Sequence, residues 1–180
     1  MANLTLNRNE PRSMFAPTAF DYVLAAGALA MLAAAVTAVL RGRVDWGVLP
    51  PVIWFHLATI CSALILTPAM LIRRKGDRRH RQLGYVWVVL MVATALGSFF
   101  IRFTNDGGFS VIHILSVLTL VVCFRLVRAA QRHDIKAHLR NVRGIVIGAL
   151  LIAGFRTFPF DRLLGQWLQG ESMHAGQVEL

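Results

Sequence analysis

Four histidines at related positions are the residues of this sequence best suited to chemistry. His56 and His113 each lie near the start of an apolar segment, whereas His80 and His138 each follow a basic turn and begin the next segment. The interval from His56 to His80 nearly equals that from His113 to His138, which predicts one helical hairpin used twice. This register predicts two pairs, His56 with His113 and His80 with His138.

Opposed imidazoles on alternate antiparallel helices can bind one iron, as in a six-coordinate b-type haem. The two pairs therefore predict one or two molecules of haem b, with the His56 pair toward the outer side of a membrane and the His80 pair toward the inner side. For His56 and His113 the alternatives to haem ligation are contact with a quinone, a role in proton transfer, or a hydrogen bond between helices. For His80 and His138, which have basic neighbours, the alternative is contact with lipid phosphate.

Arginines near the predicted helix ends are candidate partners for the anionic propionates of a haem. Arg102 and Arg156 would serve an outer haem, and Arg79, Arg140 and Arg143 would serve an inner one. Each arginine taken singly is equally well explained by a side chain that reaches the lipid headgroups.

The composition indicates an integral membrane protein. The chain has 180 residues, of which 56% are hydrophobic, and a formal net charge of +10. Twelve of its 19 lysines and arginines lie in the two stretches 73–81 and 125–143, which is typical of cytoplasmic loops and does not indicate nucleic-acid binding. The sequence shows no catalytic triad, no paired carboxylates and no phosphate-binding glycine loop, so whether it is an enzyme stays open.

The fold class predicted is all-α, a polytopic membrane bundle of five transmembrane helices. A four-helix core is expected from two repeated hairpins, 50–101 and 110–158. Pro68 predicts a kink in the second helix, and Thr67 is available there to satisfy a freed backbone group. Cys61 and Cys123 are expected to be small core residues. The predicted helices are Phe20–Leu40, Pro51–Ile72, Arg79–Ile101, Ser110–Ala130 and Ala137–Phe158.

Three parts of the chain follow from this topology. Residues 1–19 are predicted to be a cytoplasmic tail, 20–158 the transmembrane domain, and 159–180 a periplasmic tail. A short outer loop is expected at 41–49, and a short interfacial helix at 161–168, anchored by Trp167. The competing interpretation of the first span is a cleaved signal peptide, but its apolar run is longer than usual for one.

Three stretches carry a resemblance to a known family. They are RRHRQLGYVWV, FSVIHILSVLTL and RHDIKAHLRNVRGIVIGALLIAGFRTFPFDRLLG. Over roughly residues 50–165, including all four paired histidines, the chain resembles an uncharacterised family of predicted bacterial multi-pass membrane proteins, a domain of unknown function. The resemblance implies the bacterial inner membrane and no established activity. Members commonly carry an arginine directly after the last histidine, where this chain has Leu139 and then Arg140.

The arrangement of helices and histidines is also similar to that of the two-haem transmembrane cytochromes of the cytochrome b-561 kind. That resemblance implies electron transfer through the bilayer, with a quinone or a redox protein as partner. The alternatives are a non-enzymatic accessory or assembly subunit of a larger membrane complex, and a histidine-lined site for a quinone or a metal. An oligomeric state is open in each case.

Overall fold

The computed structural model describes residues 16–101, 111–159 and 162–171, and all the regular secondary structure within these ranges is helical. Arg102 and His174, most of the predicted tail 1–19 and half of the predicted tail 159–180 therefore lie outside the described residues. A 3-10 helix follows the first α-helix, and a π-helical stretch lies within the fifth. The elements are α1 (Ala19–Arg41), η1 (Gly42–Val48), α2 (Pro51–Ile72), α3 (Arg78–Ser98), α4 (Val111–Gln131), α5 (Ile135–Ile145), η2 (Val146–Ile152), α6 (Ala153–Phe155) and α7 (Leu163–Gln169).

The helix starts follow from local side-chain chemistry. Thr18 and Asp21 form a capping box at the start of α1, in which each side chain accepts a hydrogen bond from the other residue's backbone N–H. Asp77 caps α3 and Asp134 caps α5 with a single bond each, in which one carboxylate oxygen accepts from the backbone N–H three residues on. Pro51 occupies the first turn of α2, where a missing N–H costs least.

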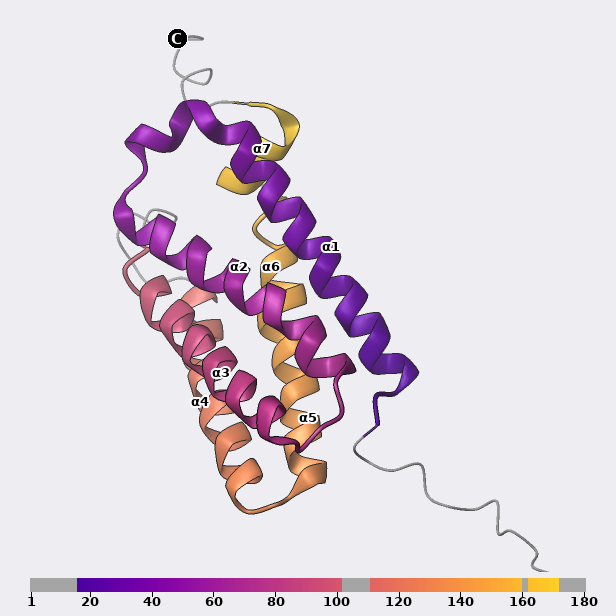
Figure 1. Cartoon of the computed structure of the whole chain (residues 1–180). Helices are drawn as coiled ribbons and strands as arrows, with labels where there is room; N and C mark the ends of the chain where they lie inside the picture. Colours follow the sequence, from indigo (N-terminus) through magenta and orange to yellow (C-terminus); the bar gives the residue numbers. More distant parts are fainter. Residues whose placement is uncertain (1–15, 102–110, 160–161, 172–180) are drawn as a thin grey trace, which may run out of the picture.

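The elements pack in the order of the sequence. α2 packs on α3, α3 on α4 and α4 on α5, and α1 packs on α2 and on η2 (Figure 1). The turns α2–α3 and α4–α5 lie at one end of the bundle, together with the start of α1. We call this end, with residues 73–81 and 128–140, the basic end. The two arginine-rich turns thus share one end, as an even number of helices between them requires.

All five long helical segments contribute to one apolar core. Its buried members come from α1, α2, α3, α4 and the α5–η2 segment. On α1 the buried side chains are mostly alanines, which let neighbouring helices approach closely. Interhelical hydrogen bonds add to this packing: the Trp87 indole donates to Thr67 Oγ1 at 2.9 Å, and the Thr94 hydroxyl donates to Thr59 Oγ1 at 2.9 Å. Thr67 in turn donates to the carbonyl of Ala63 at 2.7 Å, one turn before Pro68.

The short helix α7 differs from the expected interfacial anchor. Trp167 is fully buried rather than exposed to headgroups, and its indole nitrogen donates to Asp45 Oδ2 at 2.7 Å. The expected outer loop at 41–49 is instead the 3-10 helix η1, which supplies Asp45. Gly42 is needed at the junction because a Cβ there would collide with the Trp167 ring. The segment after the fifth helix is therefore packed onto the end of α1.

Four helical stretches among the described residues are long and apolar enough to cross a membrane. They are Ala19–Val48, Pro51–Ile72, His113–Gln131 and Ile135–Phe155. α3 is not among them, because it begins with Arg78, Arg79, His80 and Arg81. The all-helical membrane fold is confirmed, while the count of five spans and the repeated hairpin stay predictions.

Candidate functional site

His80 and His138 lie next to each other at the basic end of the bundle. Each is in the first turn of its helix, three residues after the cap Asp77 and four after the cap Asp134 respectively. The centroids of the two imidazole rings are 6.5 Å apart, and the ring planes are inclined by 71°. The repeated interval in the sequence predicted that these two residues lie together, and in the structure their rings are close enough to contact one ligand.

This distance matches what one metal ion between two imidazoles requires. A metal–nitrogen bond of about 2 Å on each side, plus roughly 1 Å from each ring nitrogen to its ring centre, separates two opposed centroids by roughly 6 Å. The two helices are not neighbours in the sequence, and both begin at the basic end, so their first turns bring the two rings to the same depth of the bundle. The distance between the ring centroids is compatible with one ligand between the two imidazoles.

The hydrogen bonds of the two rings leave ring nitrogens available. Nδ1 of His138 lies 3.3 Å from the carbonyl oxygen of Leu126 on α4, an arrangement that makes Nδ1 the protonated nitrogen and Nε2 the free one. Nδ1 of His80 is buried and has no hydrogen-bond partner among the described residues. A buried polar atom without a partner is unfavourable, and a ligand in the space between the rings would relieve it.

Both histidines line a cavity of about 470 Å³ between the helices. Ligand sites commonly enclose roughly 300–1,000 Å³. Every long helix contributes to the wall, and the lining is mostly apolar, with charged groups confined to the basic end. The apolar part includes Leu71, Trp87, Leu126 and Val146.

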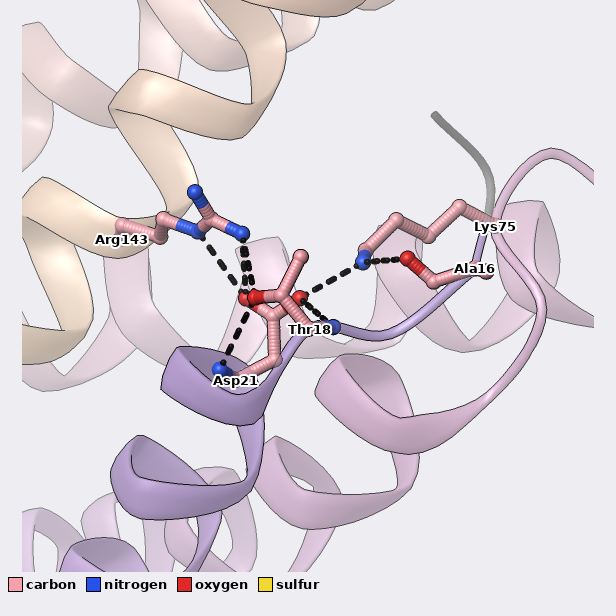
Figure 2. Close-up of polar contacts among 5 residues, drawn as sticks. All are labelled: Ala16, Thr18, Asp21, Lys75 and Arg143. Atoms are coloured by element: carbon pink, nitrogen blue, oxygen red, sulfur yellow. Dashed lines mark hydrogen bonds and ion pairs between the residues drawn. The ribbon is translucent and has the colours of Figure 1, made fainter. Parts of the chain in front are cut away.

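A buried carboxylate that the sequence did not single out also lines this cavity. Asp21 of α1 is 0% exposed, and its two oxygens are held by two cations (Figure 2). Lys75 Nζ lies 2.9 Å from Oδ2, and Arg143 Nε and Nη2 both bond on the other side, with Nε 2.9 Å from Oδ1. Arg143 also donates to Thr18 Oγ1 at 3.0 Å. A carboxylate at the start of an apolar helix was the available signal, since such a group needs a partner.

The remaining arginines of the predicted inner site lie elsewhere. Arg79 and Arg140 are exposed on the outside of the basic end, and of the three only Arg143 lines the cavity. Arg156, predicted for the outer site, is exposed at the end of α6. Arg102 lies outside the described residues.

The outer histidines occupy the opposite half of the bundle. His113 is 4% exposed, and its ring lies 5.9 Å from that of Phe99 on the neighbouring helix end. His56 is half-buried on α2, and its Nδ1 has no hydrogen-bond partner among the described residues. Their pairing across one iron stays a prediction.

Other histidines and cysteines have no such arrangement. His133 forms the turn between α4 and α5 with a left-handed backbone (φ 56°), and its ring is exposed at the mouth of the cavity. Cys123 is buried in the core, and Cys61 is half-buried. Among the described residues, no three His, Cys, Asp or Glu side chains converge as a metal site.

Comparison with known proteins adds a family and no activity. No curated protein and no solved structure matches the chain. The family model described as "Predicted membrane protein (DUF2306)" matches residues 53–155, more than half of the chain, and the match includes all four paired histidines. The chain therefore belongs to the DUF2306 family of predicted membrane proteins.

Proposed function

We propose that this membrane protein is a b-type cytochrome that carries electrons within or across the bilayer through bis-histidine haem. The observation that carries the proposal is the pair His80 and His138, 6.5 Å apart on the wall of a largely apolar cavity. Two axial imidazoles and an apolar pocket are what a non-covalent haem needs from a protein. When bound, the haem supplies a reversible one-electron centre.

The residues have distinct roles in this proposal. His138 would hold the haem iron through Nε2, because its Nδ1 donates to the Leu126 carbonyl and fixes the tautomer and the ring orientation. His80, in the first turn of α3, would supply the second imidazole ligand. Arg143, and not the exposed Arg79 or Arg140, is positioned to face a propionate, since it alone of the three lines the cavity. The apolar wall, with Trp87 among its members, keeps water from the site.

A second haem between His56 and His113 would extend electron transfer to the other side of the membrane. His113 is buried, and Nδ1 of His56 has no hydrogen-bond partner among the described residues, which leaves that nitrogen available to a ligand. Arg102 and Arg156 are the proposed propionate partners there. We place the protein in the bacterial inner membrane, with its amino terminus and its basic end on the cytoplasmic side and its carboxyl terminus in the periplasm. A quinol or a redox protein would supply the electrons.

The test is a reduced-minus-oxidised absorption spectrum of the purified full-length protein from haem-replete cells. The wild type should show the narrow α-band of low-spin b-type haem, and the double variant His80→Ala/His138→Ala should lose the component of the inner site. The matched control is His133→Asn, which alters a third histidine of the same cavity and tolerates the left-handed turn. It should leave the spectrum unchanged.

A folded, colourless wild-type protein would contradict the proposal. The accessory-subunit alternative would then gain support, since His80 and His138 would serve only packing. A protein without haem that binds a quinone in a His80-dependent way would instead support the histidine-lined quinone site.

A further inference from the structure

The buried carboxylate of Asp21 is paired with more positive charge than it can neutralise. Two cations, Lys75 and Arg143, each make a 2.9 Å contact with its oxygens, so the three side chains together carry one net positive charge (Figure 2). The side chains of Asp21, Lys75 and Arg143 are 1%, 9% and 29% exposed. Solvent screens charges at such positions weakly.

Stability alone is a weak reason for this arrangement. Removing charges from water costs free energy that a buried ion pair often fails to recover, and well-packed apolar groups can replace such pairs at no loss. The capping box at the start of α1 needs an acceptor oxygen at position 21, which a neutral amide would also provide, so the charge of Asp21 is not needed to begin the helix. Because Asp21 lies on the wall of the cavity, its charge also acts on any group that the cavity holds.

Asp21, Lys75 and Arg143 face the same cavity as His80 and His138. The other charged groups of that wall, Arg81 and Asp134, are exposed and therefore better screened. Asp77 and Arg73, which lie beside His80, pair with each other and together carry no net charge. The cluster of Asp21, Lys75 and Arg143 therefore supplies a net charge on the cavity wall that acts on any group held between the two imidazoles. It joins α1, which lies outside the matched family region 53–155, to two residues inside that region.

We propose that Asp21 sets the reduction potential of the redox group held between His80 and His138, by offsetting part of the positive charge of Lys75 and Arg143. The inference rests on the proposed function. Asp21 acts through the electrostatic potential in the cavity and touches neither the reacting atoms nor the axial nitrogens. Positive charge stabilises the reduced form of a haem, so Asp21 keeps the potential lower than the two cations alone would set it.

The experiment is a redox titration of the haem in full-length variants with altered charge. Asp21→Asn should shift the inner midpoint potential to a more positive value, and Arg143→Gln and Lys75→Gln should each shift it to a more negative one. A unit charge at roughly 10 Å in a medium of effective dielectric about 20 changes such an equilibrium on the order of tenfold. The double variant Asp21→Asn/Arg143→Gln restores the wild-type net charge and should titrate near the wild-type potential.

Asp45→Asn is the matched control. Asp45 is also 0% exposed and bonded to an indole, but it belongs to η1 at the far end of α1 from the basic end. This substitution should leave the inner potential unchanged. A purely structural role for Asp21 predicts loss of haem or broadening in every variant, not shifts of opposite sign that cancel in the double variant.

The possible failures are distinguishable. A wild-type protein without haem overturns the proposed function. Haem that is bound at normal occupancy but titrates at the same potential in Asp21→Asn and Arg143→Gln overturns the role of Asp21 alone. If Asp21→Asn does not fold, Lys75→Gln keeps the Asp21–Arg143 pair, and its predicted negative shift still decides the inference.

Discussion

At the scale of single residues, side chains far apart in the sequence make the candidate site. The four histidines could be singled out from sequence, because their types and their register within two similar stretches are local information. The role of Asp21 could not, since its partners Lys75 and Arg143 lie 54 and 122 positions away along the chain. Which cation reaches a buried carboxylate depends on helix packing, and spacing alone does not encode it. The same holds for the arginines predicted to face a haem, since Arg143 lines the cavity whereas Arg79, Arg140 and Arg156 are exposed elsewhere.

The Asp77 carboxylate illustrates how a capping residue beside the site responds to pH. Arg73 donates to it from Nε and Nη2 at 3.2 and 3.0 Å, and the backbone N–H of His80 donates to its other oxygen. The hydrogen bond from Arg73, followed by that from His80, holds the pKa of Asp77 below its ordinary value. A carboxyl whose pKa is lower when folded contributes stability above its unfolded pKa, and that contribution is lost as the pH falls through the folded value.

We therefore predict that Asp77→Asn lowers the thermal unfolding temperature slightly at pH 7, where the asparagine oxygen still caps α3 but the charge is gone. The difference from the wild type should disappear at a pH below the depressed pKa, because Asp77 is then protonated in both states. Thermal melts in detergent across this pH range measure the effect. A difference that stays constant with pH would show that the ion pair with Arg73 contributes nothing.

At the scale of elements, sequence reasoning located the helices and missed their irregularities. The observed bounds lie within a few residues of the expected ones, because Pro51, Asp77 and Asp134 are local start signals and the apolar runs have membrane length. The 3-10 helix η1 and the π-helical stretch η2 have no such signals. They arise where packing decides the backbone: η1 places Asp45 against Trp167, and η2 lies where α5 meets α1 and α4. π-helical turns often mark functional sites, and this one begins a few residues after Arg143.

At the scale of the whole molecule, composition alone predicted the class correctly. The all-helical membrane fold and the family are confirmed. The fifth span is not confirmed, because α3 is not among the helices that are long and apolar enough to cross a membrane and has its basic residues in its first turn. The sidedness also stays a prediction, which follows from both arginine-rich turns lying at one end.

Reporter fusions test that sidedness. Fusions after Lys75 and after Lys136 should both report a cytoplasmic location, since the two turns share the basic end. A periplasmic signal from one fusion alone would contradict the packing of α2 to α5, and a periplasmic signal from both would reverse the orientation. In the second case the inner site would face the periplasm.

The central claim is that His80 and His138 hold one iron together. Low-temperature electron paramagnetic resonance of the oxidised protein tests it most directly, with His80→Ala, His138→Ala and the double variant compared at equal protein concentration. If the two residues are axial ligands of one haem, each single variant should abolish the same low-spin signal. The double variant should then look like either one, because residues that act as a unit are not additive. Loss of different components from the two single variants, or an unchanged signal in both, would contradict the claim.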